Sequence, residues 1–214
     1  MNILRSESLS TREFDLILAL LQAGGVIAFP TDTAYGLGVD PFNDKAVRQL
    51  FTLKGRAESK PILLLVDSLE MAEGIIIGNP LFHKVASAFW PGPLTLVLPA
   101  KPIVPATVTA GTGTIGIRWP TAQFAIDLLR RFGKPLTATS ANRSGEPSCI
   151  TAAEVAAAFG DSLPMLIDGG ELPDRGGSTL LDLTTSPATV LREGPISFAT
   201  LNIFFDGNIR RMSA

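Results

Sequence analysis

A run of small polar residues at positions 136–148 has the composition of a ligand-binding loop. The run begins apolar and β-branched, then turns into hydroxyl and amide residues around a Gly-Glu-Pro turn. Ser140, Asn142 and Ser148 offer neutral hydrogen-bonding groups, and the low side-chain bulk lets a ligand approach backbone N–H groups. Such a loop suits an anionic ligand. The same residue types also make ordinary surface loops, so this segment alone leaves both interpretations open.

Two other regions could bring cations and hydroxyl groups to such a loop. Lys54 and Arg56 flank a glycine at the expected end of a helix, where they could form one arm of a phosphate site or act as solvated partners of the helix dipole. We expect both charges to be exposed. Arg118 ends a strand pattern, and residues 31–38 form an expected hydroxylated, glycine-containing loop. Tyr35 in that loop is the sole tyrosine; a half-buried packing ring is the less favoured alternative to a role in ligand binding.

The single cysteine and single histidine narrow the chemistry. Cys149 cannot form an intramolecular disulfide, and with His83 alone it cannot provide the ligand spacing of a zinc site. We expect His83 at a partly exposed helix position and Cys149 in a packing role. The sequence assigns no metal-ligating residues.

Composition indicates a globular chain that is not a dedicated nucleic-acid binder. The 214 residues are 46% hydrophobic and 18% charged, with a formal net charge of −2 and a pI of about 5.4. A protein that grips RNA or DNA through phosphates is usually basic, although a local basic cleft stays compatible with this charge. No apolar run approaches the ~20 residues of a membrane span, and the first residues show no signal-peptide pattern. We therefore expect a cytoplasmic protein that does not associate with a membrane.

Helix and strand patterns alternate along the chain. About eight short strands and six helices predict a single three-layer α/β domain over residues 1–214, with a core at about 10–197 and a tail at 198–214. Its sheet should be twisted, mixed and mostly buried, with helices on both faces. Polar loops recur directly after strands, and such loops at one sheet edge are where open α/β folds bind ligands. Expected helices start at the capping boxes 10–13 and 151–154 and cover 43–54, 79–90 and 123–132, whereas expected strands include 26–29, 62–66, 94–98, 115–118, 165–167, 179–183 and 188–191.

In combination, these segments resemble the YrdC/TsaC family. The match runs in order from about residue 10 to 197, and each motif would be weak alone. The motifs are Phe-Pro-Thr-Asp-Thr-Ala-Tyr-Gly-Leu-Gly at 29–38, Lys-Gly-Arg at 54–56, Pro-Gly-Pro-Leu-Thr-Leu at 91–96, Arg118, Ser-Ala-Asn-Arg-Ser-Gly at 140–145, Ser-Thr at 178–179 and Leu-Arg-Glu-Gly-Pro at 191–195.

The resemblance implies a reaction and a fold. The family's enzymes are threonylcarbamoyl-AMP synthases, which combine L-threonine, bicarbonate or CO₂ and ATP and release pyrophosphate. Their product supplies a group added to adenosine in tRNA by a downstream threonylcarbamoyl-transferase machinery. The family fold is a twisted mixed sheet around a concave, positive cleft. Within the family, the chain resembles the short type, for which we expect no additional C-terminal domain of the kind found in longer members.

The resemblance also implies roles for particular residues. Mg²⁺ is expected to be carried with ATP, with no metal ligands assigned in the protein. Two positions depart from the pattern of some members, Lys60 in place of Asn and Leu65 in place of His, so the contacts at these two positions stay open. The implied catalytic set is Lys54, Arg56, Ser140 and Asn142; the ATP-binding set is Arg56, Lys60, Thr114, Ser140, Ser148 and Arg192; and the threonine-binding set is Thr33, Tyr35, Arg118, Ala138 and Ser178.

Two alternatives are weighed against the synthase. A paralogue that only binds double-stranded RNA or tRNA would use the same cleft, but the acidic pI disfavours it, and we expect at most weak contact with tRNA. A carbamoyl-transferring domain of hydrogenase-maturation proteins belongs to much larger chains than 214 residues.

Overall fold

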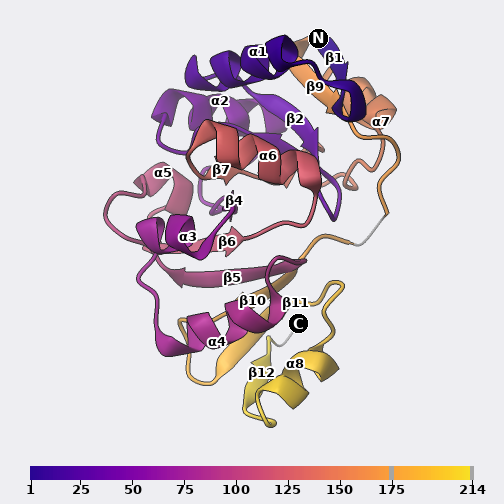
Figure 1. Cartoon of the computed structure of the whole chain (residues 1–214). Helices are drawn as coiled ribbons and strands as arrows, with labels where there is room; N and C mark the ends of the chain where they lie inside the picture. The colour runs from indigo at the N-terminus through magenta and orange to yellow at the C-terminus, as the bar shows by residue number, and fades with distance from the viewer. Residues whose placement is uncertain (174–175, 213–214) are drawn as a thin grey trace.

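The computed structural model describes residues 1–173 and 176–212 of the chain. These residues form twelve strands, eight α-helices and two 3₁₀ helices (Figure 1). The strands are β1 (Asn2–Arg5), β2 (Ile27–Pro30), β3 (Tyr35–Gly38), β4 (Leu64–Leu65), β5 (Leu94–Pro99), β6 (Thr114–Arg118), β7 (Leu136–Thr137), β8 (Thr139–Ser140), β9 (Met165–Asp168), β10 (Thr179–Asp182), β11 (Ala188–Arg192) and β12 (Ile209–Arg211). The helices are η1 (Ser6–Ser8), α1 (Thr11–Gln22), α2 (Asp44–Lys54), α3 (Leu69–Ile75), α4 (Pro80–Phe89), α5 (Ala106–Thr109), α6 (Gln123–Phe132), α7 (Ala152–Phe159), η2 (Gly160–Ser162) and α8 (Phe198–Phe204).

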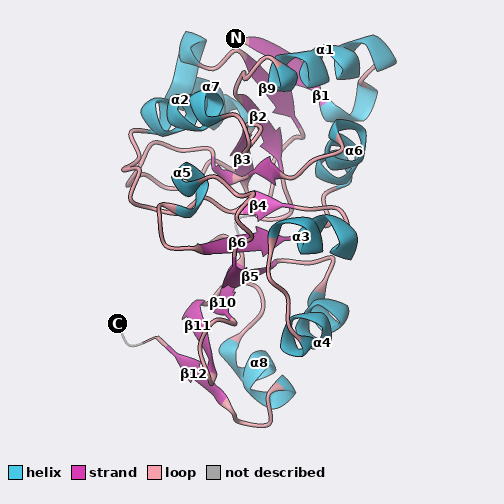
Figure 2. Cartoon of the chain, turned by 90° about the vertical axis from the view of Figure 1, so that its left-hand side faces the viewer, coloured by secondary structure: helices cyan, strands magenta, loops and turns pink. Residues whose placement is uncertain are grey.

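The strands make two mixed sheets, and one short segment of the chain contributes a strand to each of them. One sheet has the order β1-β9-β2-β3-β8 and the other β12-β11-β10-β5-β6-β4-β7. β7 and β8 are separated by Ala138 alone, yet β7 pairs with β4 and β8 pairs with β3. The Ala138 N–H also donates to the Leu63 carbonyl oxygen at 3.0 Å. The strands consequently follow one another down the molecule as a twisted column (Figure 2).

Helices cover both faces of this column, as predicted for a three-layer α/β fold. In Figure 2, α2, α5 and α7 lie on one side, whereas α1, α3, α4 and α6 lie on the other. Two of the helices pack against each other around aromatic rings, with Phe14 of α1 5.9 Å from Phe124 of α6 between ring centroids. The buried residues of α6 recur at helical spacing, namely Phe124, Ala125, Leu128, Leu129 and Phe132.

The sequence signals for helix ends are confirmed. The side chains of Ser10 and Thr151 each accept a hydrogen bond from the backbone N–H of the N3 glutamate. The side chain of that glutamate in turn accepts from the backbone N–H of the cap residue. Asn43 and Asn79 cap α2 and α4. Gly55 ends α2 in the left-handed conformation with φ 61°, which a residue with a Cβ rarely adopts.

The strand pattern differs from the prediction in several places. The fold class is confirmed, but the single expected sheet is two sheets, and the described residues hold twelve strands instead of about eight. Residues 35–38, expected as loop, are β3; its two glycines lower the β-propensity that would have marked it. The expected strand 62–66 is regular only at β4. The region expected as a tail, 198–214, contains α8 and β12.

The C-terminal elements continue the second sheet. β12 pairs in parallel with β11, through Ala188–Ile209 and the next two residue pairs. Phe204 of α8 lies edge-on to Phe89 of α4, with 5.1 Å between ring centroids. Among the residues that the structure describes, none of the helices combines the length and apolarity that crossing a bilayer would require.

Gly194 allows the chain to pass very close to the start of β10. A Cβ at this position would lie 2.6 Å from the Gly177 carbonyl oxygen and 2.7 Å from the Thr179 backbone nitrogen. These are backbone atoms, so they cannot move aside as the end of a side chain could. The Thr179 hydroxyl fastens this approach, because it accepts from the backbone N–H groups of Gly194 and Ile196 at 3.0 and 3.1 Å.

We therefore expect Gly194→Ala to destabilise the fold by about 1–3 kcal/mol, the usual effect of overpacking a close contact. Gly74, within α3, is a matched control, since a Cβ there meets nothing within 4 Å. Gly74→Ala should raise the free energy of unfolding by up to about 1 kcal/mol. Urea denaturation of both variants measures the two effects, and a Gly194→Ala protein as stable as wild type would contradict the close approach.

Candidate active site

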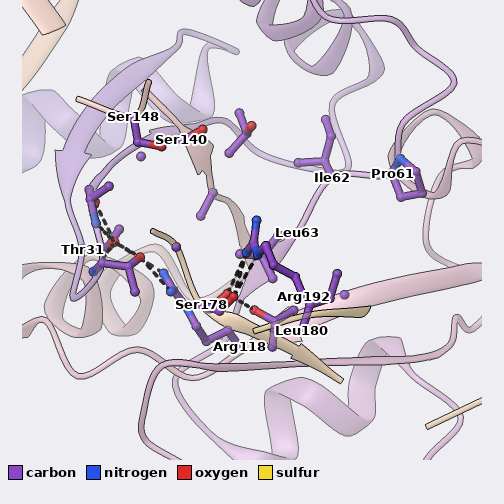
Figure 3. Close-up of a pocket in the computed structure, with 18 of the residues that line it drawn as sticks. Thr31, Pro61, Ile62, Leu63, Arg118, Ser140, Ser148, Ser178, Leu180 and Arg192 are labelled. Carbon is purple, nitrogen blue, oxygen red and sulfur yellow. Dashed lines mark hydrogen bonds between the residues drawn. The ribbon is translucent and has the colours of Figure 1, made fainter. Parts of the chain in front are cut away.

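A cavity of about 520 Å³ opens where the two sheets meet (Figure 3). Its wall combines the β2–β3 turn and the Ala138–Ser140 junction with residues of β5, β6 and β10. Segments distant in sequence therefore converge on one hollow. Ten of the residues named from the sequence line it: Thr33, Tyr35, Arg56, Thr114, Arg118, Ala138, Ser140, Ser148, Ser178 and Arg192.

Three of the named residues are not among the described residues that line the cavity. Lys60 is exposed, and Lys54 and Asn142 are buried behind the wall. The expectation that Lys54 is an exposed charge is wrong, because its side chain turns inward beneath the loop that follows β8. Leu65, where the family pattern varies, is fully buried in the core around α1 and α6.

Lys54 holds the turn between Ser140 and Asn142. Its ammonium group donates to the Asn142 carbonyl oxygen at 2.8 Å, to the Asn142 Oδ1 at 2.9 Å and to the Ser140 carbonyl oxygen. Asn142 Nδ2 in turn donates to the carbonyl oxygens of Arg143 and Glu146. Burial, with Arg56 as a second cause, lowers the pKa of Lys54 to about 8. This network fixes the loop that presents Ser140 to the cavity.

Arg56 and Arg192 bring two guanidinium groups to the wall. Arg56 is anchored by one bond from Nη2 to the Pro61 carbonyl oxygen at 2.8 Å. Arg192 is anchored by Nε and Nη2, which both donate to the Ser178 carbonyl oxygen at 3.1 and 2.9 Å. Burial lowers the pKa of each guanidinium. A guanidinium has five N–H groups, so both residues can still donate to an anion in the cavity.

Arg118 forms the most deeply buried charged group of the wall. Its side chain is 3% exposed, and Nη1 donates to the Thr33 hydroxyl at 3.0 Å. Burial lowers the pKa of Arg118, whereas the neighbouring Asp32 carboxylate acts to raise it. Asp32 is an element of the site that the residue assignment from sequence missed, although it sits between two hydroxyl residues in the Thr-Asp-Thr motif.

Ser178 lines the same cavity as Arg118, and its carbonyl and hydroxyl oxygens accept hydrogen bonds from Arg192. Its hydroxyl lies 2.6 Å from the Thr95 hydroxyl of β5. Thr95 also lines the cavity and was not singled out from sequence. Its signal was a hydroxyl residue within the otherwise apolar strand 94–98.

Tyr35 lines the cavity but its hydroxyl is engaged elsewhere. The ring is fully buried, so neither a half-buried ring nor a freely available hydroxyl describes it. The hydroxyl donates to the Gly170 carbonyl oxygen at 2.7 Å and accepts from the Gly169 N–H at 2.9 Å. Burial raises the pKa of Tyr35 to about 12. Tyr35 thus ties β3 to the end of β9.

The lone histidine and cysteine lie outside this cavity. His83 is half-exposed on α4 and lies 3.6 Å from Glu73, in agreement with the expected surface position. Cys149 is buried, and burial together with the Glu154 carboxylate raises the pKa of its thiol. A thiol with a raised pKa is a poor nucleophile.

The cavity is chemically suited to two anionic groups. Arg118, with the hydroxyls of Thr33 and Ser178, forms one polar end. Arg192, which is hydrogen-bonded to Ser178, adds a second guanidinium beside this end, and Arg56 and Ser140 supply a cation and a hydroxyl from other parts of the wall. Such a site can position and neutralise negatively charged reactants without a covalent intermediate on the protein.

Comparison with known proteins supports the resemblance found in the sequence. The profile of the Sua5/YciO/YrdC family, described as telomere recombination, matches residues 19–194. A threonylcarbamoyl-AMP synthase of Pyrococcus abyssi is 39% identical over 175 residues, covering 81% of this chain and 52% of the relative. The Klebsiella pneumoniae enzyme of that name is 37% identical over 171 residues, covering 78% of this chain and 90% of the relative.

A solved structure shows the same architecture. P. abyssi Sua5 complexed with L-threonine has a TM-score of 0.91 at 36% identity, covering 99% of this chain and 62% of that chain. This chain spans about half the length of the Pyrococcus relative. The family profile covers most of the chain, and the residues that carry the resemblance converge on one cavity. The chain belongs to the Sua5/YciO/YrdC family.

Proposed function

We propose that this chain is a threonylcarbamoyl-AMP synthase, a nucleotidyltransferase that uses L-threonine, bicarbonate or CO₂ and ATP and releases pyrophosphate. One observation carries the proposal: a single cavity brings Arg118, Thr33 and Ser178 together with the cations Arg56 and Arg192, of which Arg192 is bonded to Ser178. The relatives named threonylcarbamoyl-AMP synthase and the Sua5 complex with L-threonine support it.

L-Threonine would bind at the Arg118 end. A planar guanidinium can meet the substrate carboxylate with two parallel hydrogen bonds. Thr33 and Ser178 provide hydroxyls for the polar groups of the amino acid. Ala138 and the Tyr35 ring, which also line this cavity, would contact its apolar atoms.

ATP would bind across the rest of the wall. Arg56, Ser140, Ser148, Thr114 and Arg192 all line the cavity and would contact the nucleotide, with the guanidinium groups next to its phosphates. Lys60 stays a proposed ATP contact; its exposed side chain follows Arg56 closely in the chain and is separate from the wall.

The reaction needs no protein nucleophile. The threonine amine adds to CO₂ and loses a proton, which gives a carbamate. A carbamate oxygen then attacks the α-phosphorus of ATP, the bond from that phosphorus to the bridging oxygen breaks, and pyrophosphate leaves with the electron pair. Arg56 and Arg192 would stabilise the charge that builds up on the phosphates, and the buried wall would hold both reactants in line.

Mg²⁺ would enter with the nucleotide. The donors on the wall are mostly hydroxyl and guanidinium groups, and Asp182 is the carboxylate among the described lining residues. Such a set fits an ion that is held chiefly by phosphate oxygens and water, as Mg²⁺ often is. The ion would neutralise charge on the triphosphate.

Lys54 and Asn142 would act on the reaction through Ser140. Four acceptor oxygens surround the Lys54 ammonium group, namely the carbonyl oxygens of Ser140 and Asn142, Asn142 Oδ1 and, at 3.4 Å, the Ser140 hydroxyl, and they occupy its three N–H donors. Lys54 would therefore position the loop instead of touching a phosphate. This assignment differs from a direct phosphate contact and follows from the burial of the amine.

The product would pass to a downstream tRNA threonylcarbamoyl-transferase machinery in the cytoplasm. The RNA-binding alternative lacks comparable support, because the net charge is −2 and Arg118, one of the three cavity cations, is buried in the wall. We propose at most weak, salt-sensitive contact with tRNA.

Pyrophosphate release tests this function. With ATP supplied, release should require both L-threonine and bicarbonate, and withholding either should abolish it. Addition of tRNA should change the rate little, because tRNA is no reactant in this step. Release that is equally fast without threonine would contradict the proposed reaction, and tight, salt-resistant tRNA binding without pyrophosphate would favour the RNA-binding alternative.

Activity should fall as pH rises through about 8, where Lys54 loses its proton. The neutral amine donates two hydrogen bonds instead of three, so one oxygen of the Ser140–Asn142 turn loses its partner. We expect the ratio of wild-type to Lys54→Met kcat/KM to fall between pH 7 and 9; taking this ratio removes the effect of pH on the substrates.

Unfolding cannot explain that loss. The pKa of Lys54 in the folded state lies below its value of 10.5 in the unfolded chain, so the unfolded chain binds more protons between pH 8 and 10.5. The contribution of Lys54 to stability therefore rises with pH in this window. Thermal unfolding at each pH serves as the control, and a ratio that stays constant would contradict the assigned role.

A further inference from the structure

Asp32 is a buried carboxylate without a hydrogen bond. Its side chain is 6% exposed, and neither carboxylate oxygen has a hydrogen-bond partner within residues 1–173 and 176–212. Burying an unpaired carboxylate is unfavourable, so such a group is normally compensated by a nearby charge. The Arg118 guanidinium provides this charge, with Nη2 3.6 Å from Asp32 Oδ1.

The two charges stand at different depths relative to the cavity. Arg118 lines it, whereas Asp32 is outside the described lining residues. The Arg118 guanidinium is fastened to the Thr33 hydroxyl by Nη1, and Nη2 lies 3.4 Å from the Thr31 hydroxyl, which Figure 3 shows beside the cavity. Asp32 lies between these two threonines in the sequence, so the same turn that anchors the Arg118 guanidinium also brings the carboxylate against it.

This arrangement changes the charge of the amino-acid end. Arg56 and Arg192 line the same cavity, so three guanidinium groups would attract any anion, including a plain carboxylate or a phosphate. Asp182 is a second carboxylate at the wall, but its Oδ1 accepts from the Thr184 N–H and hydroxyl, at 2.8 and 2.6 Å. Asp32 is the carboxylate in ion-pair contact with Arg118, and in a low-dielectric interior its field extends into the cavity.

We propose that Asp32 is a positioning and specificity-determining residue, which pairs with Arg118 so that this end of the cavity binds a zwitterionic α-amino acid in preference to a carboxylate without an amine. The inference rests on the proposed threonine site. The guanidinium attracts the substrate carboxylate, and the Asp32 carboxylate favours the positive α-ammonium group beside it. A carboxylate without an amine is attracted by the Arg118 guanidinium but repelled by the Asp32 carboxylate.

Two ligands separate this role from a purely structural one. L-Threonine and (R)-3-hydroxybutyrate share a carboxylate, a hydroxyl and a methyl group, but 3-hydroxybutyrate has no α-amino group. Calorimetric titration gives the dissociation constant of each for wild type and for Asp32→Asn, which keeps the size of the side chain and removes its charge. We expect the wild type to prefer threonine by at least about tenfold, and Asp32→Asn to lose about tenfold of that preference.

Asp161→Asn is the matched control, because it removes one carboxylate charge from a fully exposed side chain outside the cavity. It should leave both dissociation constants unchanged. If threonine and 3-hydroxybutyrate weaken by the same factor in Asp32→Asn, Asp32 merely supports Arg118 and the specificity role is overturned. Unchanged affinities for both ligands would also overturn it.

Two further outcomes are decided by the wild type. If Asp32→Asn does not fold, equal affinity of the wild-type protein for the two ligands still overturns the proposal. A wild-type protein that binds neither ligand contradicts the proposed threonine site itself, and this outcome is distinct from failure of the Asp32 role.

Discussion

The site depends on one constraint, the short segment at 136–140 that belongs to both sheets. β7 pairs with β4 on one side of Ala138, and β8 pairs with β3 on the other. The backbone can serve both sheets only where the strands separate, and the cavity lies at this separation. Ala138 and Ser140 therefore reach its wall from a segment that is held by strand pairing on both sides. A small side chain at 138 keeps the hollow open.

Buried cations give this hollow its chemistry. Arg118 is stabilised by hydroxyl groups and by the Asp32 carboxylate, and Lys54 by the oxygens of the Ser140–Asn142 turn. Charges held in this way need little reorganisation when an anion arrives, which favours a reaction that depends on positioning and charge stabilisation. The formal net charge of the whole chain at pH 7, −2, does not indicate this local concentration of positive groups.

The sequence predicted what local rules control. Apolar periodicity and caps placed α1, α2, α4, α6 and α7, and motif spacing named ten of the residues that line the cavity. It could not predict the split into two sheets, because that split depends on how β3, β4 and the 136–140 segment pair in space. Nor could it show that Lys54 turns inward or that Asp32 meets Arg118, since these contacts join positions 86 residues apart or more, such as Lys54 and Ser140.

We propose that one cavity joins threonine, through a carbamate, to the α-phosphate of ATP. Its most direct test uses ATP labelled at the α-phosphorus together with threonine labelled in its carbon chain, with bicarbonate present, and separation of the products by chromatography. We expect one new compound that carries both labels in equal amounts, and no such compound when the label is on the γ-phosphorus. Recovery of the α-label only in AMP or ADP, without threonine carbon, would contradict it.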